Sequence, residues 1–188
     1  MKYAMIESSY WLRFSIFPGI GPGRYAKLLL YFGSAKDAWN ASLVELKKSK
    51  IGESLSAEFI DFRKKFSVEA YEEKLLKAKV SYVTLDDHDY PKLLKAIKNP
   101  PFVLFYKGDK KILRSVQDDT YIGVVGTRKI TEYGRHVTEL LTRELVDAGC
   151  VIVSGLALGV DALAHQTTID AGGKTIAVLG CGVDCPYP

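Results

Sequence analysis

The fold is decided by the stretch Val151-Ile-Val-Ser-Gly-Leu-Ala-Leu-Gly-Val-Asp-Ala-Leu-Ala-His165. Together with the preceding Cys150, its first three residues form a run of apolar and β-branched residues, Cys150 to Val153, which is typical of a buried strand. The run stops at Ser154-Gly155, and a helical pattern opens at Asp161 after a second glycine, Gly159. A strand, a glycine-containing loop and a helix in this order predict one unit of an α/β fold.

The same design occurs on both sides of this stretch. Residues 121–125 form a short apolar strand that closes at Gly126-Thr127-Arg128 and leads into a helix reaching Ala148. A third strand, 174–179, ends in Gly180-Cys181-Gly182. The alternation predicts a Rossmann-like parallel βαβαβ sheet. Because three strands leave an edge unpaired, we expect a truncated sheet that belongs to a fragment or is completed by another chain.

Loops at the carboxyl ends of parallel strands open on one edge of the sheet, where amides and helix N-termini favour anions. Gly126, Gly155 and Gly180 follow the three strands, and Arg128 and Lys174 accompany them. Each glycine by itself is typical of a tight turn. Together with the two cations they predict a phosphate-bearing ligand at one rim. The dinucleotide fingerprint and the P-loop are absent, which disfavours an NAD enzyme and a P-loop ATPase.

Composition bounds the protein class. The chain has 188 residues and is 47% hydrophobic, enough for one medium domain and a smaller one. It lacks an apolar run of about 18 residues and a visible signal peptide, so we expect a cytoplasmic protein with reduced thiols and no membrane contact. Residues 128–188 carry 5 Lys/Arg against 7 Asp/Glu. Nucleic-acid binding would therefore depend on a few placed cations.

The N-terminal part is predicted to be a separate, all-helical domain of the helix-hairpin-helix or SAM-like type over residues 1–78, followed by the Rossmann-like domain over 79–188. The glycine-rich turn 17–24 resembles a hairpin that holds a DNA phosphate, and a ligand-free helical scaffold is the alternative. The pattern predicts a helix over 56–77 and strands over 80–85 and 102–106. Those two strands are expected to join one edge of the later sheet.

Several ordered motifs resemble the bacterial DNA-processing protein A (DprA/Smf) family. They are Tyr90-Pro91 with Leu94, Pro101-Phe-Val-Leu-Phe-Tyr-Lys-Gly108, Val124-Val-Gly-Thr-Arg128 with Tyr133-Gly134, Ser154-Gly-Leu-Ala-Leu-Gly-Val-Asp161 with Ala164-His165, and Gly173-Lys-Thr-Ile-Ala-Val-Leu-Gly-Cys-Gly-Val-Asp184 with Tyr187-Pro188. The resemblance covers residues 90–188 and is weaker before residue 80.

The resemblance implies a protein without catalytic activity or cofactor that binds single-stranded DNA, protects it during natural transformation and loads the RecA recombinase. It also implies self-association of the full-length protein. The family's DNA pocket includes an arginine and a lysine, and the residues of this chain that match them are Arg128 and Lys174. The expected DNA-binding residues are Gly126, Thr127, Arg128, Ser154, Gly155, Gly159 and Lys174. A stacking partner for the bases stays unidentified, since the sequence between Tyr133 and Tyr187 holds no aromatic residue.

Three alternatives stay open. The first is a nucleotide-binding or nucleotide-hydrolysing enzyme related to phosphoribohydrolases, although the phosphate loop of that group is absent. The second is a duplex-DNA-binding N-terminal hairpin beside a merely structural Rossmann part. The third concerns Asp161 and His165, which share a helical face and form either an acid–base pair or, as we favour, a helix N-cap with a packed imidazole. Cys181 and Cys185 alone are a weak metal signature, and we expect no metal.

Overall fold

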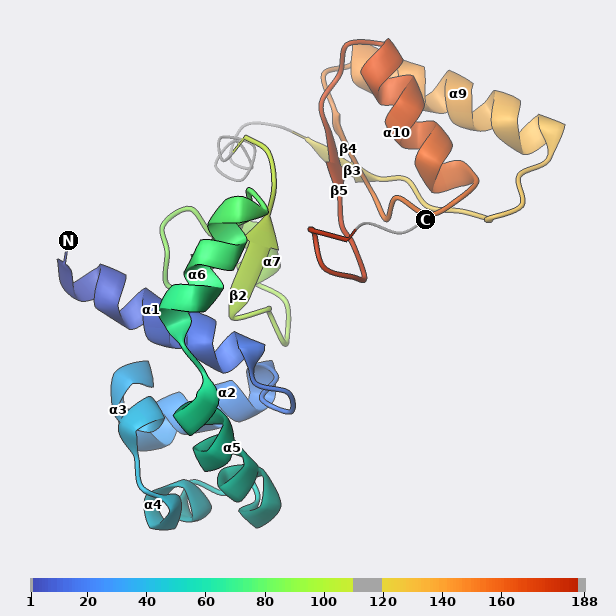
Figure 1. The fold of residues 1–188 in the computed structure, drawn as a ribbon. Coiled ribbons are helices and arrows are strands. Elements are labelled where there is room, and N and C mark those ends of the chain that lie inside the picture. The colour runs from blue at the N-terminus through green and yellow to red at the C-terminus, as the bar shows by residue number, and fades with distance from the viewer. Residues whose placement is uncertain (1, 110–119, 186–188) are drawn as a thin grey trace. The chain divides into compact units, whose positions relative to one another are not determined.

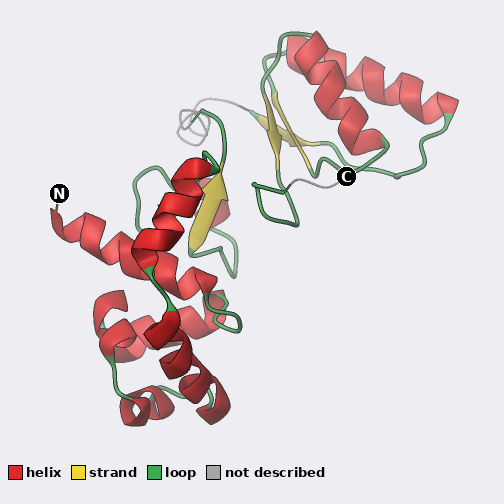
Figure 2. Ribbon diagram, viewed as in Figure 1, coloured by secondary structure: helices red, strands yellow, loops and turns green. Residues whose placement is uncertain are grey.

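We describe the protein from a computed structural model that covers residues 2–109 and 120–185, with residues 2–6 described by their backbone alone. The chain divides into two compact units, Met1–Gly108 and Asp109–Pro188. The first is mostly helical and the second is a layered α/β unit (Figure 2). The predicted boundary after residue 78 does not coincide with this division, because two strands pack with the helices of the first unit.

The first unit contains short helices and one strand pair. Its elements are α1 (Lys2–Ile16), α2 (Pro22–Phe32), α3 (Ala35–Asn40), α4 (Leu43–Lys48), α5 (Glu53–Lys65), α6 (Val68–Lys77), β1 (Ser81–Thr84), α7 (Lys92–Lys95) and β2 (Val103–Tyr106). Helices α3 and α4 begin directly after serine residues, which are typical N-cap residues. Ser34 caps α3 by accepting from the amide of Asp37, and Ser42 and Glu45 form a capping box on α4.

Aromatic packing holds the first unit together. Phe59 of α5 is fully buried, stacks on Phe14 with ring centroids 5.2 Å apart, and meets Trp39 edge-on at 5.1 Å. Tyr25 of α2 stacks on Phe102 at 4.0 Å, so the segment entering β2 belongs to the same core. Because aromatic rings bury large apolar areas, these contacts explain why short helices form a stable unit.

Two expectations for this region are corrected. Strands β1 and β2 pair antiparallel with each other in their own sheet and do not join the later one. The predicted helix over 56–77 is two helices, because Phe66 turns extended and Ser67 caps α6 by accepting from the amide of Ala70. Phe66 packs near Trp39 at 6.2 Å between ring centroids, a tertiary contact that the local pattern does not reveal.

The second unit confirms the predicted parallel sheet. It contains β3 (Tyr121–Gly123), α9 (Glu132–Asp147), β4 (Val151–Ser154), α10 (Val160–Asp170) and β5 (Thr175–Ala177). The strand order is β3-β4-β5, with both pairs parallel. Helices α9 and α10 pack against each other on one side of the sheet (Figure 1). This is expected because right-handed crossovers between successive neighbouring strands place both helices on one face.

Candidate nucleic-acid interface

The candidate site lies at the edge of the second sheet where β3 and β4 end and α9 and α10 begin. We call this region, residues 124–131 and 155–160, the carboxyl edge. Asp161 organises it from the first turn of α10, where it is only 7% exposed. Its carboxylate accepts hydrogen bonds from the amides of Gly126 (3.3 Å) and Gly155 (3.1 Å). One side chain therefore ties both loops to α10, and the helix N-terminus stabilises its charge.

The N-cap residue of α10 is Gly159, so the prediction that Asp161 caps this helix is wrong. Its position is nevertheless structural, because both carboxylate oxygens are engaged by backbone amides. This arrangement also means that the amides of Gly126 and Gly155 are already satisfied by the protein. A phosphate at this edge must use other donors.

The three glycines of the predicted site leave room for α10. A Cβ on Gly126 would lie 2.7 Å from the Val160 side chain, and one on Gly155 would lie 2.9 Å from the Asp161 carboxylate. Gly159 has φ +86°, and a Cβ there would collide with the carbonyl of Thr127 and the backbone of Arg128. Glycine is required at these positions by close packing within the protein, whether or not a ligand binds.

Arg128 lies between the amino ends of the two helices and is exposed. The amide of Val160 donates to the carbonyl of Thr127 at 3.1 Å, which brings the start of α10 against this segment. The hydroxyl of Thr127 accepts from the amide of Lys129 at 3.1 Å, and Thr131 caps α9 by accepting from the amide of Gly134. Two helix N-termini and a guanidinium thus share one region, which attracts anions.

Unused backbone donors accompany Arg128. Within the described residues, the amides of Thr127, Arg128 and residues 156–159 donate no hydrogen bond. Leu156 has φ +55°, an unusual conformation for a side-chain-bearing residue that occurs in loops shaped by function. These amides are available to a ligand or to water.

Ser154 and Lys174 do not contribute to this edge as predicted. Ser154 is buried, and its hydroxyl donates to the carbonyl of Val124 at 2.6 Å, so it joins β3 to β4. Lys174 precedes β5, and its carbonyl accepts from the amide of Ile152 at 3.0 Å, near the start of β4. The backbone of Lys174 therefore lies at the opposite, amino end of the sheet. The prediction that Arg128 and Lys174 meet at one rim is wrong.

His165 packs on the inner side of α10, as favoured, and is 5% exposed. The hydroxyl of Thr175 donates to the carbonyl of Ile152 at 2.9 Å, so the Nδ1 of His165 is the donor in its 2.7 Å contact with that hydroxyl. Its Nε2 has no hydrogen-bond partner among the described residues. Burial lowers the pKa of His165, while the Asp161 carboxylate and the Ser154 backbone oppose that change. A neutral imidazole therefore connects α10 to β5.

Sequence reasoning missed further exposed side chains that follow Arg128 within seven residues of the chain. Lys129, Tyr133 and Arg135 are all exposed, and Tyr133 is in the first turn of α9. A signal was present, because four of the five Lys/Arg residues after position 127 lie between residues 128 and 143. That clustering indicates that the start of α9 belongs to the candidate interface.

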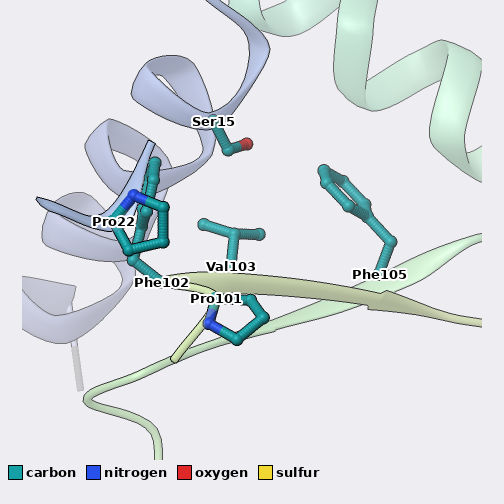
Figure 3. A pocket seen from close by; sticks show the side chains of 6 residues that line it. All are labelled: Ser15, Pro22, Pro101, Phe102, Val103 and Phe105. Carbon is teal, nitrogen blue, oxygen red and sulfur yellow. The ribbon is translucent and has the colours of Figure 1, made fainter. Parts of the chain in front are cut away.

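The first unit offers two other features. The turn after α1 is a compact hairpin, in which the Arg24 guanidinium donates to the carbonyl of Gly19 at 2.7 Å. A hollow of about 300 Å³ is lined by Ser15, Pro22, Pro101, Phe102, Val103 and Phe105 (Figure 3). Its lining is apolar, and the Ser15 hydroxyl donates to its own helix at Leu12. This hollow has no charged group to hold an anionic ligand.

In residues 2–109 and 120–185, no three His, Cys, Asp or Glu side chains come together as a metal site would require. No helix in that part of the chain is both long and apolar enough to span a bilayer. Cys181 and Cys185 are exposed thiols.

Known proteins are similar to this chain in sequence and fold. The family model described as DNA recombination-mediator protein A matches residues 81–188. A Smf protein of Synechocystis is 37% identical over 183 residues, which cover 97% of this chain and 46% of that protein. DNA processing protein DprA of Bacillus subtilis is 43% identical over 109 residues, covering 58% of this chain and 36% of the relative.

A solved structure of a DprA protein is also similar to this chain. The X-ray structure of DprA from Streptococcus pneumoniae is similar with a TM-score of 0.71 and 31% identity, over 95% of this chain and 59% of that one. The chain spans less than half the length of the two curated relatives. The family model covers more than half of this chain, in agreement with the motifs. The chain therefore belongs to the DNA recombination-mediator protein A family, that of the DprA and Smf proteins.

Proposed function

We propose that this chain binds single-stranded DNA at the carboxyl edge of its second unit. It would do so within a DprA/Smf-type protein of the cytoplasm that protects incoming strands during natural transformation and loads RecA recombinase on them. The observation that carries the proposal is the exposed Arg128 between the amino ends of α9 and α10, beside backbone amides without protein partners.

The chemistry of this edge suits one or two phosphates. The Arg128 guanidinium presents a planar fork of donors that matches phosphate oxygens. The amides of Thr127 and of residues 156–159 supply further donors, and both helix dipoles add positive potential. Lys174 stays in the proposal as a separate contact at the other end of β5, reached by a strand that extends beyond the edge.

A flexible single strand fits these charges better than a duplex. Residues 128–188 carry more acidic than basic side chains, so the unit has no broad basic surface to follow two phosphate backbones. A single strand can bend so that one phosphate reaches a localised site and its bases face the protein. Sequence preference is then slight, and affinity falls as salt rises.

We further propose that the function is binding rather than catalysis. The acid–base candidates Asp161 and His165 are both engaged in internal hydrogen bonds, and both are buried. A nucleotide-hydrolysing enzyme needs an accessible general base near the phosphate. Release of base from nucleoside monophosphates by the purified chain would support the phosphoribohydrolase alternative instead.

The test is a titration of the 188-residue chain with fluorescently labelled oligo-dT at several salt concentrations. Arg128→Ala should weaken binding about 10-fold or more at low salt, because it removes a charge-assisted phosphate contact. Arg143→Ala is the control for charge, since it removes one guanidinium from α9 about 16 Å beyond the start of that helix and away from the Arg128 loop. Lys174→Glu should have a smaller effect than Arg128→Ala.

Equal affinity of wild type and Arg128→Ala would overturn the proposal. Duplex DNA competing as well as oligo-dT would argue for the hairpin of the first unit, and changes at Pro22 and Gly23 would then weaken binding. The RecA part has its own assay, which is the acceleration of RecA filament formation on single strands coated with the 188-residue chain. Loss of that acceleration with Arg128→Ala is the expected result.

A further inference from the structure

One aromatic side chain of the second unit is left outside its core. Among the described residues of that unit the aromatic side chains are Tyr121, which is half-buried, and Tyr133, which is 78% exposed. The ring of Tyr133 contacts no other described ring, and its hydroxyl makes no hydrogen bond with the described residues. Packing within this unit therefore does not explain a large aromatic residue at this position.

The backbone that carries Tyr133 is held firmly. Thr131 caps α9 at the amide of Gly134 (3.1 Å), and its carbonyl accepts from the amide of Arg135 (2.8 Å). A Cβ on Gly134 would lie only 3.2 Å from the Ile130 side chain, so the chain enters the helix in close contact with itself. The ring is thus presented from a fixed helical turn, and ordering it costs little because Tyr has two side-chain torsions.

Tyr133 lies on the outer face of α9. Thr138 and Thr142 are buried and mark the face that packs inward, while Tyr133, His136 and Leu140 share the opposite, exposed face. Arg128 is five residues before Tyr133, so their Cα atoms are at most about 17 Å apart. A short oligonucleotide can therefore reach both residues at once.

We propose that the Tyr133 ring is a stacking platform for an unpaired base whose strand is held by phosphate contacts at Arg128. This inference rests on the proposed function and adds to it the group that selects single strands. A base in a duplex has both faces covered by its neighbours, whereas an unpaired base can exchange water for an aromatic ring. Charge at Arg128 supplies attraction, and Tyr133 supplies the preference for unpaired bases.

The experiment compares the binding of two strands by the wild-type 188-residue chain, by three further variants and by Arg128→Ala. The strands are oligo-dT and an oligonucleotide of equal length whose residues are abasic. Tyr133→Leu removes the ring, Tyr133→Phe keeps it, and Leu140→Ala is a control on the same exposed face. Because Tyr133 is exposed and makes no internal hydrogen bond, circular dichroism and melting of these variants should match wild type.

Tyr133→Leu should weaken oligo-dT binding about 10-fold, as loss of one base–aromatic contact does, while Tyr133→Phe and Leu140→Ala bind as wild type. The abasic strand should bind wild type and Tyr133→Leu equally. The effect of Tyr133→Leu should also persist at high salt, where that of Arg128→Ala shrinks.

The outcomes separate the inference from the proposed function. If Tyr133→Leu binds oligo-dT like wild type while Arg128→Ala does not, stacking at Tyr133 is wrong and the phosphate site stands. If Tyr133→Leu weakens the abasic strand as much as oligo-dT, the ring acts by some means other than stacking, and the inference is equally overturned. If wild type binds neither strand, the proposed function itself fails.

Discussion

The two units of this protein bury different kinds of side chain. In the described part of the first unit the core is a large cluster of buried aromatic and aliphatic side chains. In the described part of the second unit the buried hydrophobic side chains are Val151, Ile152 and Ala164, whereas the buried polar ones are Thr138, Thr142, Ser154, Asp161, His165, Thr167 and Thr168. The buried side chains of the first unit are thus mainly apolar, and those of the second unit are mainly polar, with Asp161 and Ser154 hydrogen-bonded to the backbone.

This difference bears on function. Apolar packing tolerates changes of shape when volume is kept, but a buried polar network loses stability when one partner is removed. The carboxyl edge is held by such a network, because Asp161 binds the amides of Gly126 and Gly155. The loops that present Arg128 are therefore fixed before any ligand arrives.

The largest effect is expected from Phe59→Ala in the first unit. Phe59 is fully buried and packs on Phe14, Phe17 and Trp39, so its loss should cost about 3–5 kcal/mol of unfolding free energy. Urea unfolding followed by tryptophan fluorescence measures this, since Trp11 and Trp39 both belong to the first unit. Amide exchange at Ile152, in the second unit, should be unchanged. If Ile152 shows the same loss of stability as the tryptophan transition, the two units unfold together.

Asp161→Ala tests the second unit and should cost about 2–3 kcal/mol, because it removes the charged acceptor of two part-buried backbone amides. Faster amide exchange at Gly126, Gly155 and Ile152 is the measurement, with the tryptophan transition of the first unit as an internal control. Asp161→Asn keeps one acceptor oxygen and should lose less. Unchanged exchange at Gly126 and Gly155 would contradict the polar-network description.

The smallest effect concerns pH. Burial lowers the pKa of His165 below its unfolded value, so between these two values the unfolded state binds more protons. The stability contribution is complete above about pH 6.5 and is lost as pH falls through the folded pKa. The protection factors of second-unit amides, which are exchange rates corrected for their intrinsic pH dependence, should therefore fall from pH 7 to pH 5.5, and His165→Gln should flatten that dependence. If wild type and His165→Gln show the same pH dependence, a titratable group other than His165 causes it.

Local sequence patterns predicted much of the fold. The alternation of apolar runs, glycine loops and helical spacing identified the three parallel strands and their two helices. The partners of β1 and β2 were predicted wrongly, because strand pairing was decided by Phe102 and Val103 packing into the aromatic core. A short strand with apolar residues fits either sheet, and only the surrounding contacts distinguish them.

The positions of the candidate site residues were predicted only in part. Arg128 and the glycine loops were correctly located at the carboxyl ends of β3 and β4. Lys174 was misplaced, although a residue that precedes a parallel strand necessarily lies at the amino end. Tyr133 was overlooked because exposure cannot be read from one aromatic residue in an amphipathic helix.

The sequence by itself determined the elements and their order, because apolar periodicity, capping residues and glycines act over a few neighbouring positions. Tertiary structure alone decided which sheet each strand joins and which groups Asp161 holds. Gly126 is 35 residues from Asp161 in the chain, and a hydrogen bond over that distance exists only after β3, β4 and α10 have packed. The position of a cation relative to a ligand site is likewise a property of the packed sheet.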